Sequence, residues 1–135
     1  PFILSFQPLE LNDEIMSFGY PRVQKEAVDT KTTFKFTGIW TSGIIKEYCP
    51  DGGFLLRNRC YQTSMHIENG ASGGPVFKKS YVVGINSTGW LLEEGQEPLS
   101  YITPIDYIYD LQFEFESGKL VTVKELIDQN LIQTK

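Results

Sequence analysis

The sequence lacks the features that several classes of protein require. Its 12 Lys and Arg residues are outnumbered by 17 Asp and Glu residues, which gives a formal net charge of −5 at pH 7. This acidic balance argues against a nucleic-acid partner, because phosphate binding needs a basic patch. No hydrophobic run approaches the roughly 20 residues of a membrane-spanning helix, and no signal-peptide pattern is visible. No Cys and His spacing suits zinc, so we expect neither a metal nor another cofactor.

Cysteine and histidine are also scarce. The two cysteines, Cys49 and Cys60, flank a turn signal at residues 51–53. They are compatible with one disulfide across a loop and equally with two free thiols in strands, so they do not indicate a compartment. The chain has one histidine, His66. It begins at Pro1, without a methionine, and runs straight into an apolar stretch, so we expect it to be cut from a larger protein.

What the sequence does contain is a series of short β-like runs. They are separated by turn signals at Gly, Pro, Asn and Asp. Residues 33–39 alternate apolar and polar side chains, which is the period of a half-buried strand. Strands at this spacing predict a small antiparallel barrel or sandwich. The other expected strands cover residues 41–48, 54–63, 76–79, 81–87 and 100–103.

Helix signals appear only near the C-terminus. Residues 104–111 place apolar side chains on one face, with a proline near the start. A second candidate helix covers residues 122–129, where Thr122 and Glu125 have the spacing of a capping box. A β-like run, residues 112–116, lies between these two segments.

The most informative segment is the glycine-dense stretch Asn69-Gly70-Ala71-Ser72-Gly73-Gly74-Pro75. Glycine permits positive φ and leaves room where another backbone must approach. A peptidase needs such a loop because the carbonyl under attack becomes an oxyanion, and two backbone N–H groups must point at that oxygen in advance. Ser72 is therefore a candidate nucleophile.

The same letters also fit G-x-S-x-G, the nucleophile elbow of the α/β-hydrolases. That motif needs a helix after the serine, whereas Pro75 and a β-like run follow Ser72 here. It also needs the histidine downstream, and His66 lies upstream. We therefore reject the elbow. A glycine turn between two strands that merely holds a serine is the structural alternative.

The loop resembles the G-x-S-G-G-P signature of the chymotrypsin-like (trypsin-like) serine peptidases. Gln62 and Thr63 stand nine to ten residues before the serine, a spacing that resembles the bacterial high-temperature-requirement proteases. The resemblance covers roughly residues 9–111. Three further segments carry it: residues 11–21, which resemble the entry into the second barrel, residues 83–89, which resemble the strand after the nucleophile, and residues 101–105, which resemble the last strand.

This resemblance implies an all-β domain. It would be the second six-stranded antiparallel Greek-key barrel of a chymotrypsin-like fold, with a C-terminal helix and a short extra segment. We expect residues 1–21 to be an inter-barrel linker and strand. Residues 22–111 would form the barrel, and residues 112–135 a C-terminal extension with a helix.

The resemblance also implies a function. The parent protein would be a serine endopeptidase that cleaves a peptide or protein substrate through an acyl-enzyme on Ser72. The N–H groups of Gly70 and Ser72 would form the oxyanion hole. An extended substrate would add as a strand, and His66 with Asn86 would favour a polar or acidic side chain in the pocket. The substrate-binding residues expected on this basis are His66, Ile67, Asn86, Ser87, Thr88 and Gly89.

The sequence departs from the family in two places. Ala71 replaces the aspartate that pairs with a newly cut N-terminus in secreted digestive members. The family's histidine and aspartate belong to an N-terminal barrel that is absent from this sequence, and the resemblance implies that His66 faces the specificity pocket rather than the serine oxygen. We therefore expect the N-terminal barrel of the parent as a partner, and this chain alone to be nearly inactive. The rival hypothesis is a non-catalytic peptide-binding module that kept the pocket and lost the triad.

Overall fold

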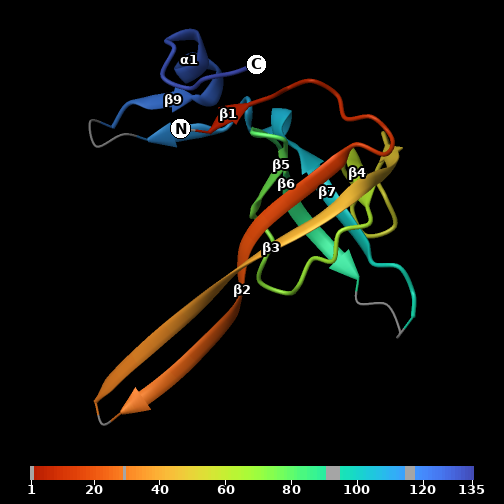
Figure 1. Cartoon of the computed structure of the whole chain (residues 1–135). Coiled ribbons are helices and arrows are strands. Elements are labelled where there is room, and N and C mark those ends of the chain that lie inside the picture. The colour runs from red at the N-terminus through yellow and green to blue at the C-terminus, as the bar shows by residue number, and fades with distance from the viewer. Residues whose placement is uncertain (1, 29, 91–94, 115–117) are drawn as a thin grey trace.

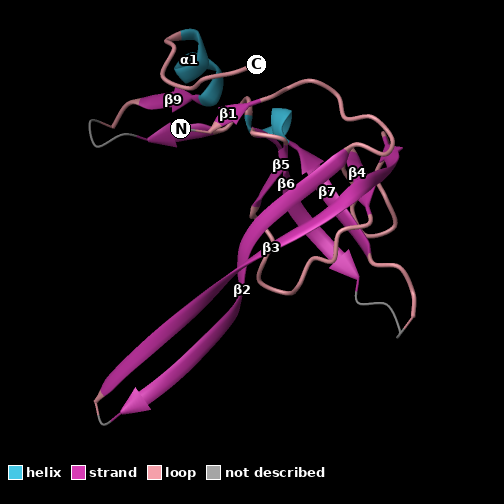
Figure 2. Cartoon of the chain, viewed as in Figure 1, coloured by secondary structure: helices cyan, strands magenta, loops and turns pink. Residues whose placement is uncertain are grey.

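The structure, a computed structural model, describes residues 2–28, 30–90, 95–114 and 118–135. Most of its elements are strands (Figure 2). Within those ranges, no helix combines the length and the apolar character that crossing a membrane takes. In chain order the elements are β1 (Ile3–Leu4), β2 (Glu14–Val28), β3 (Lys31–Cys49), β4 (Cys60–Thr63), β5 (Pro75–Lys78), β6 (Tyr81–Trp90), β7 (Leu99–Pro104), η1 (Ile105–Ile108), β8 (Gln112–Glu114), β9 (Leu120–Thr122) and α1 (Val123–Asp128).

Six strands form a closed antiparallel ring. Their order is β6-β5-β2-β3-β4-β7, and a further pairing between β6 and β7 closes it. β4 and β5 follow each other in sequence but are not neighbours, so the connection between them crosses from one side of the ring to the other (Figure 1). β1 adds to β6 as a short parallel strand. The ring confirms the all-β, six-stranded antiparallel architecture expected from the sequence.

Apolar side chains fill the ring. Ile45, Met65 and Ile102 are at most 1% exposed and belong to one cluster; burying each such side chain contributes roughly 1.5–3 kcal/mol. Alternate residues of a strand point to the same face, so Ile15 and Ser17 of β2 both point inward, with 3% and 1% exposure. Ser17 is thus a polar residue at a core position, where it requires hydrogen-bond partners.

β2 and β3 form a long hairpin whose distal half leaves the barrel (Figure 1). The strands contain 15 and 19 residues, and β2 crosses the boundary expected between residues 21 and 22. Their register shifts between Gly19 and Arg22, a bulge of the kind that bends and twists a strand. Residues 33–39 form the predicted strand, but residues 31–38 are exposed on both faces. Their alternation therefore does not reflect half-burial against the barrel.

The loop between β3 and β4 joins the two cysteines. Cys49 lies directly opposite Cys60 across the strand pair, and both are buried free thiols. Burial, with the neighbouring Cys49, raises the pKa of the Cys60 thiol to about 11. Gly52 turns the chain at φ +99°, and β4 begins only at Cys60, so the strand expected over residues 54–63 is shorter than predicted.

The C-terminal segment packs beside the start of the chain. The helix expected over residues 104–111 is a single 3-10 turn, η1. The N–H groups of Tyr109 and Leu111 donate to the carbonyls of Asp106 and Ile108, three residues back rather than the four of an α-helix. The capping box of Thr122 and Glu125 is present at α1 and confirms that prediction. The final residues then bond to both the N–H and the carbonyl of Leu4, which places β1 between β6 and the C-terminus.

Candidate active site

The serine loop, residues 69–75, lies in the connection that crosses the ring from β4 to β5 (Figure 1). It packs against β2, where a Cβ placed on Gly19 would lie 3.1 Å from the Cβ of Ala71. The connection begins at the end of β4, which is largely buried, and ends at β5, whose two middle residues are buried.

The structure gives a physical reason for glycine at each of the three glycine positions of the loop. Gly70 and Gly73 have φ values of +92° and +84°, the left-handed region that favours glycine. Gly74 is required for space, because a Cβ there would lie 2.8 Å from the carbonyl oxygen of Phe18 and 3.0 Å from that of Ala71. The glycine density in the sequence therefore reflects two conformational requirements and one close approach.

Four backbone hydrogen bonds fix the course of the loop. The N–H of Gly73 donates to the carbonyl of Asn86 at 2.8 Å, and the N–H of Asn86 donates to the carbonyl of Gly74 at 2.9 Å. These two bonds join the loop to β6. Gly74 donates to Ala71 within the loop, and Ala71 donates to Glu68 just before the loop, both at 3.1 Å.

The groups that the sequence singled out for chemistry are left available. Within the described part of the chain, neither the N–H of Gly70 nor that of Ser72 donates to a backbone acceptor. Ser72 is exposed to solvent. By contrast, the N–H groups of Ala71, Gly73 and Gly74 all donate to backbone carbonyls.

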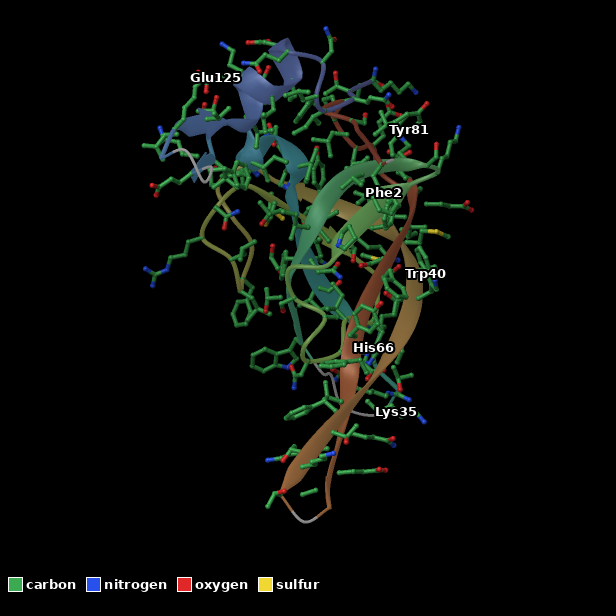
Figure 3. The ribbon with its side chains drawn as sticks, turned by 90° about the vertical axis from the view of Figure 1, so that its left-hand side faces the viewer. Phe2, Lys35, Trp40, His66, Tyr81 and Glu125 are labelled. Carbon is green, nitrogen blue, oxygen red and sulfur yellow. The ribbon has the colours of Figure 1, made fainter. Side chains whose placement is uncertain are left out.

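The expected pocket residues come from two segments that the fold brings together. One is the approach to the serine loop, where His66 is exposed (Figure 3) and Ile67 is buried. The other is the end of β6, where Ser87, Thr88 and Gly89 are half-buried. A Cβ on Gly89 would lie 3.0 Å from the carbonyl oxygen of Ile67, so the two segments are in direct contact.

Asn86, the sixth expected pocket residue, lies beneath the loop. It is only 2% exposed. Its side-chain amide donates to the hydroxyl of Ser17 at 2.6 Å and to the carbonyl of Ala71 at 3.3 Å. The hydroxyl of Ser17 in turn donates to the carbonyl of Pro75 at 2.8 Å. These contacts are directed at the inner side of the serine loop.

An ion pair also holds the approach to the loop. Arg22, beside the bulge of β2, contacts Glu68 through Nη2 and Oε1 at 2.9 Å and through Nε and Oε2 at 3.2 Å. Hydrogen bonding to the Arg22 guanidinium lowers the pKa of Glu68. Because the carbonyl of Glu68 accepts the N–H of Ala71, this pair connects the hairpin to the start of the loop.

Comparison with known proteins identifies the family. The sequence model of the Trypsin family matches residues 5–111, most of the chain. The chain belongs to the trypsin family. The crystal structure of Deg5 is similar to it, with a TM-score of 0.51 and 18% sequence identity, over 80% of this chain and 44% of the Deg5 chain. No curated protein matches the sequence.

Family and fold together confirm the resemblance noted from the sequence. At this level of identity the likeness to Deg5 concerns the fold alone, and the sheet of this trypsin-family chain resembles a chymotrypsin-like barrel. The chain spans less than half the length of the Deg5 chain. The comparisons therefore establish membership of a serine-protease family. The activity of the whole protein is proposed below.

The trypsin-family site carries a nucleophile candidate without a visible base. His66 is the only histidine in the sequence, and it is exposed on the approach to the serine loop. Among the described residues, no group of three or more His, Cys, Asp or Glu side chains is arranged to hold a metal.

Sequence reasoning missed three residues that support this site. Ser17, Arg22 and Glu68 contact the loop or its approach across long sequence separations, which no local motif encodes. One signal was available for Ser17, because it shares the inward face of β2 with Ile15 and is a polar residue in a core position. Arg22 and Glu68 offered no such signal.

Proposed function

We propose that this chain is the serine-bearing half of a serine endopeptidase. Ser72 would form the acyl-enzyme, and an N-terminal barrel of the parent protein would supply the histidine and the aspartate. The observation that carries the proposal is an exposed Ser72 in a loop whose amide groups at Gly70 and Ser72 have no backbone acceptor, while those of Ala71, Gly73 and Gly74 are bonded. Membership of the trypsin family supports it.

The proposed reaction has two halves. The Oγ of Ser72 attacks the carbonyl carbon of the substrate peptide, and the hydroxyl proton passes to the histidine. The C–N bond breaks, the leaving nitrogen takes that proton, and an ester on Ser72 remains. Water then attacks the ester by the same route and releases the acid. The N–H groups of Gly70 and Ser72 stabilise the oxyanion in both halves, and one such donor accounts for about 10²–10³ in kcat.

The edge of β6 supports an extended substrate. β5 pairs with β6 only from Tyr81 to Ile85, whereas β6 continues to Trp90 and is paired there on its other side with β7. Ser87 and Gly89 therefore lie on an edge that β5 does not cover. We propose that the substrate adds to this edge as an antiparallel strand, since an exposed edge offers regularly spaced donors and acceptors.

His66 is proposed to read the side chain before the cleaved bond. Its exposed imidazole lies next to the buried Ile67, whose carbonyl contacts Gly89 on the opposite wall. An imidazole at the end of a pocket can hydrogen-bond a carboxylate or another polar group. On this basis the preferred substrate has a polar or acidic side chain at that position.

The proposed N-terminal barrel would cover an aromatic face on the outside of the barrel. Neighbouring ring centroids along this face lie 5.0 to 6.4 Å apart. Four members are more than half exposed, from 53% for Tyr20 to 71% for Phe2. The aromatic face consists of Phe2, Phe18, Tyr20, Phe36, Trp40 and Phe77 (Phe2 and Trp40 are labelled in Figure 3).

Two observations favour that occupant. The aromatic face adjoins the serine loop, because the carbonyl of Phe18 lies 2.8 Å from the Cβ position of Gly74. The Deg5 chain has more than twice the length that this chain aligns with, since only 44% of it is covered. A contiguous exposed apolar surface of this kind marks an interaction site.

Active-site labelling tests the proposal. The parent protein is treated with a fluorophosphonate probe, and the labelled residue is identified by mass spectrometry, with Ser72→Ala as the matched control. We expect labelling at Ser72 in the parent, none in the control, and at least a thousandfold slower labelling of this chain alone, because the base is missing. A parent that binds peptides but is not labelled would instead be the non-catalytic peptide-binding module.

A further inference from the structure

We infer that Asn86 is a positioning residue: it ties the serine loop to the barrel so that the two free amide groups keep their place. This inference rests on the proposed peptidase function and adds a residue that acts on the oxyanion donors without touching the substrate. It also assigns Asn86 a different role from the pocket position that the family resemblance implied.

The orientation of the Asn86 amide follows from its neighbours. The carbonyl of Pro75 can only accept, so the hydroxyl of Ser17, 2.8 Å away, must donate to it. That hydroxyl therefore accepts from Asn86 at 2.6 Å, which requires the NH₂ group on this side. The carbonyl of Ala71, 3.3 Å from the same nitrogen, likewise only accepts. Both hydrogens of the amide are thus directed at the loop or its support.

Asn86 forms hydrogen bonds to several residues of the serine loop. Its backbone N–H and carbonyl bond Gly74 and Gly73, and its side chain bonds the carbonyl of Ala71. Through Ser17 it also reaches the carbonyl of Pro75. The residues on both sides of Ser72 are therefore held by one residue of β6. A displacement of about 1 Å at a reacting centre can cost about 10²-fold in rate. Hydrogen bonds that fix the position of this loop therefore contribute to the rate.

The Asn86 side chain is a poor choice for stability alone. Within the described residues, its Oδ1 is buried and has no hydrogen-bond partner, which is unfavourable for a polar atom. Its two acceptors do not depend on it, because the hydroxyl of Ser17 still donates to Pro75 and the carbonyl of Ala71 still accepts from Gly74. An apolar side chain of the same shape would leave no donor unpaired. At position 86, stability therefore favours an apolar side chain, whereas holding the serine loop in place favours asparagine.

This conflict allows a positioning role to be distinguished from a merely structural one, because the two roles predict different effects of a substitution on stability and on kcat. Leucine has the same number of side-chain heavy atoms as asparagine and cannot donate. We expect Asn86→Leu in the parent protein to unfold within a few degrees of the wild type. We expect its kcat and its fluorophosphonate labelling rate to fall at least tenfold, with KM within about twofold, because only the transition-state interaction is weakened.

Asn58→Leu is the matched control. Asn58 is also a partly buried asparagine whose amide nitrogen contacts two acceptors, the carbonyl of Arg59 at 3.0 Å and the hydroxyl of Thr103 at 3.4 Å. It lies outside the serine loop and its supports. We expect Asn58→Leu to keep kcat within twofold. If Asn86→Leu also keeps kcat within twofold, or loses it only in proportion to lost stability, the inference is wrong.

A second measurement separates this inference from the peptidase proposal. Hydrogen exchange of the peptides that cover residues 68–75 reports whether the loop is held, whether or not the protein is an enzyme. We expect faster exchange in Asn86→Leu than in the wild type and in Asn58→Leu. If the wild-type parent is never labelled at Ser72 but this exchange changes, the enzyme proposal fails and the loop tether stands. If exchange is unchanged, the tether itself is refuted.

Discussion

Adding one methyl group at Gly74 should displace the serine loop. A Cβ at this position would lie 2.8 Å from the carbonyl oxygen of Phe18 and 3.0 Å from that of Ala71. Both atoms belong to the backbone, so neither can move away by a side-chain rotation. Reaching the ordinary contact distance of 3.4 Å requires a shift of about 0.6 Å. Overpacking of this kind costs about 1–3 kcal/mol.

The expected effect on chemistry follows from the direction of that shift. The methyl group would push Gly74 away from β2, and the loop carries Ser72 and its amide with it. Because about 1 Å of misplacement can cost about 10²-fold in rate, we expect Gly74→Ala in the parent protein to lower the labelling rate at Ser72 about tenfold. Urea unfolding should show a loss of free energy of unfolding of about 1–3 kcal/mol.

Gly73 and Gly95 supply the controls. Both have positive φ, +84° and +92°, and a Cβ on either would meet no atom of the described residues within 4 Å. Alanine in that region costs about 1–2 kcal/mol, so Gly73→Ala and Gly95→Ala should lose similar stability. Gly95→Ala, which is outside the loop, should keep the wild-type labelling rate. The steric reasoning would be refuted if Gly74→Ala unfolded like the wild type and was labelled as fast.

Three further outcomes are expected. His66→Ala in the parent should reduce the preference for acidic or polar side chains in a cleavage profile over a peptide library, and an unchanged profile would exclude the pocket role. Because burial raises the pKa of the Cys60 thiol from 9.0 to about 11, the folded state holds that proton more tightly. The free energy of unfolding should therefore fall as the pH rises from about 9 to 11, less so in Cys60→Ala, and native thiols should react slowly with a disulfide reagent at pH 7.5. Trp40→Ser, which removes a ring that is 60% exposed, should reduce self-association of the isolated chain in sedimentation velocity; equal association in both proteins would argue against the aromatic face as an interface.

The features of this structure that could be predicted from the sequence depend on interactions between residues close together in the chain. The capping box of Thr122 and Glu125 is set within four residues and forms as expected. The glycines around Ser72 are likewise local, because positive φ at Gly70 and Gly73 is a property of single residues. The alternation in residues 33–39 did predict a strand. It could not predict that this strand leaves the barrel, since exposure depends on what packs against it.

The parts that sequence reasoning missed depend on the closure of the ring. Ser17 and Asn86 are 69 residues apart, and Arg22 and Glu68 are 46 residues apart. Each pair meets only because the ring places β2 next to β5, which pairs with β6, and brings the connection from β4 to β5 against β2. Family resemblance placed Asn86 in the pocket by its position in the strand. Its burial and its two donated hydrogen bonds depend instead on Ser17 of β2 and on the serine loop, which a strand pattern does not describe.

The loop's supports explain how the two halves of the proposed enzyme would divide the chemistry. All the hydrogen bonds that fix the loop come from β2, β6, the loop itself and Glu68 just before it, which belong to the same barrel as Ser72. On the proposed mechanism, the placement of the Gly70 and Ser72 amide donors would therefore not depend on an N-terminal barrel. Removing triad members from serine peptidases leaves about 10³–10⁴-fold catalysis over water, from the oxyanion hole and binding. On the proposed mechanism, this chain would provide that residual rate enhancement, and the N-terminal barrel would provide the groups that transfer protons.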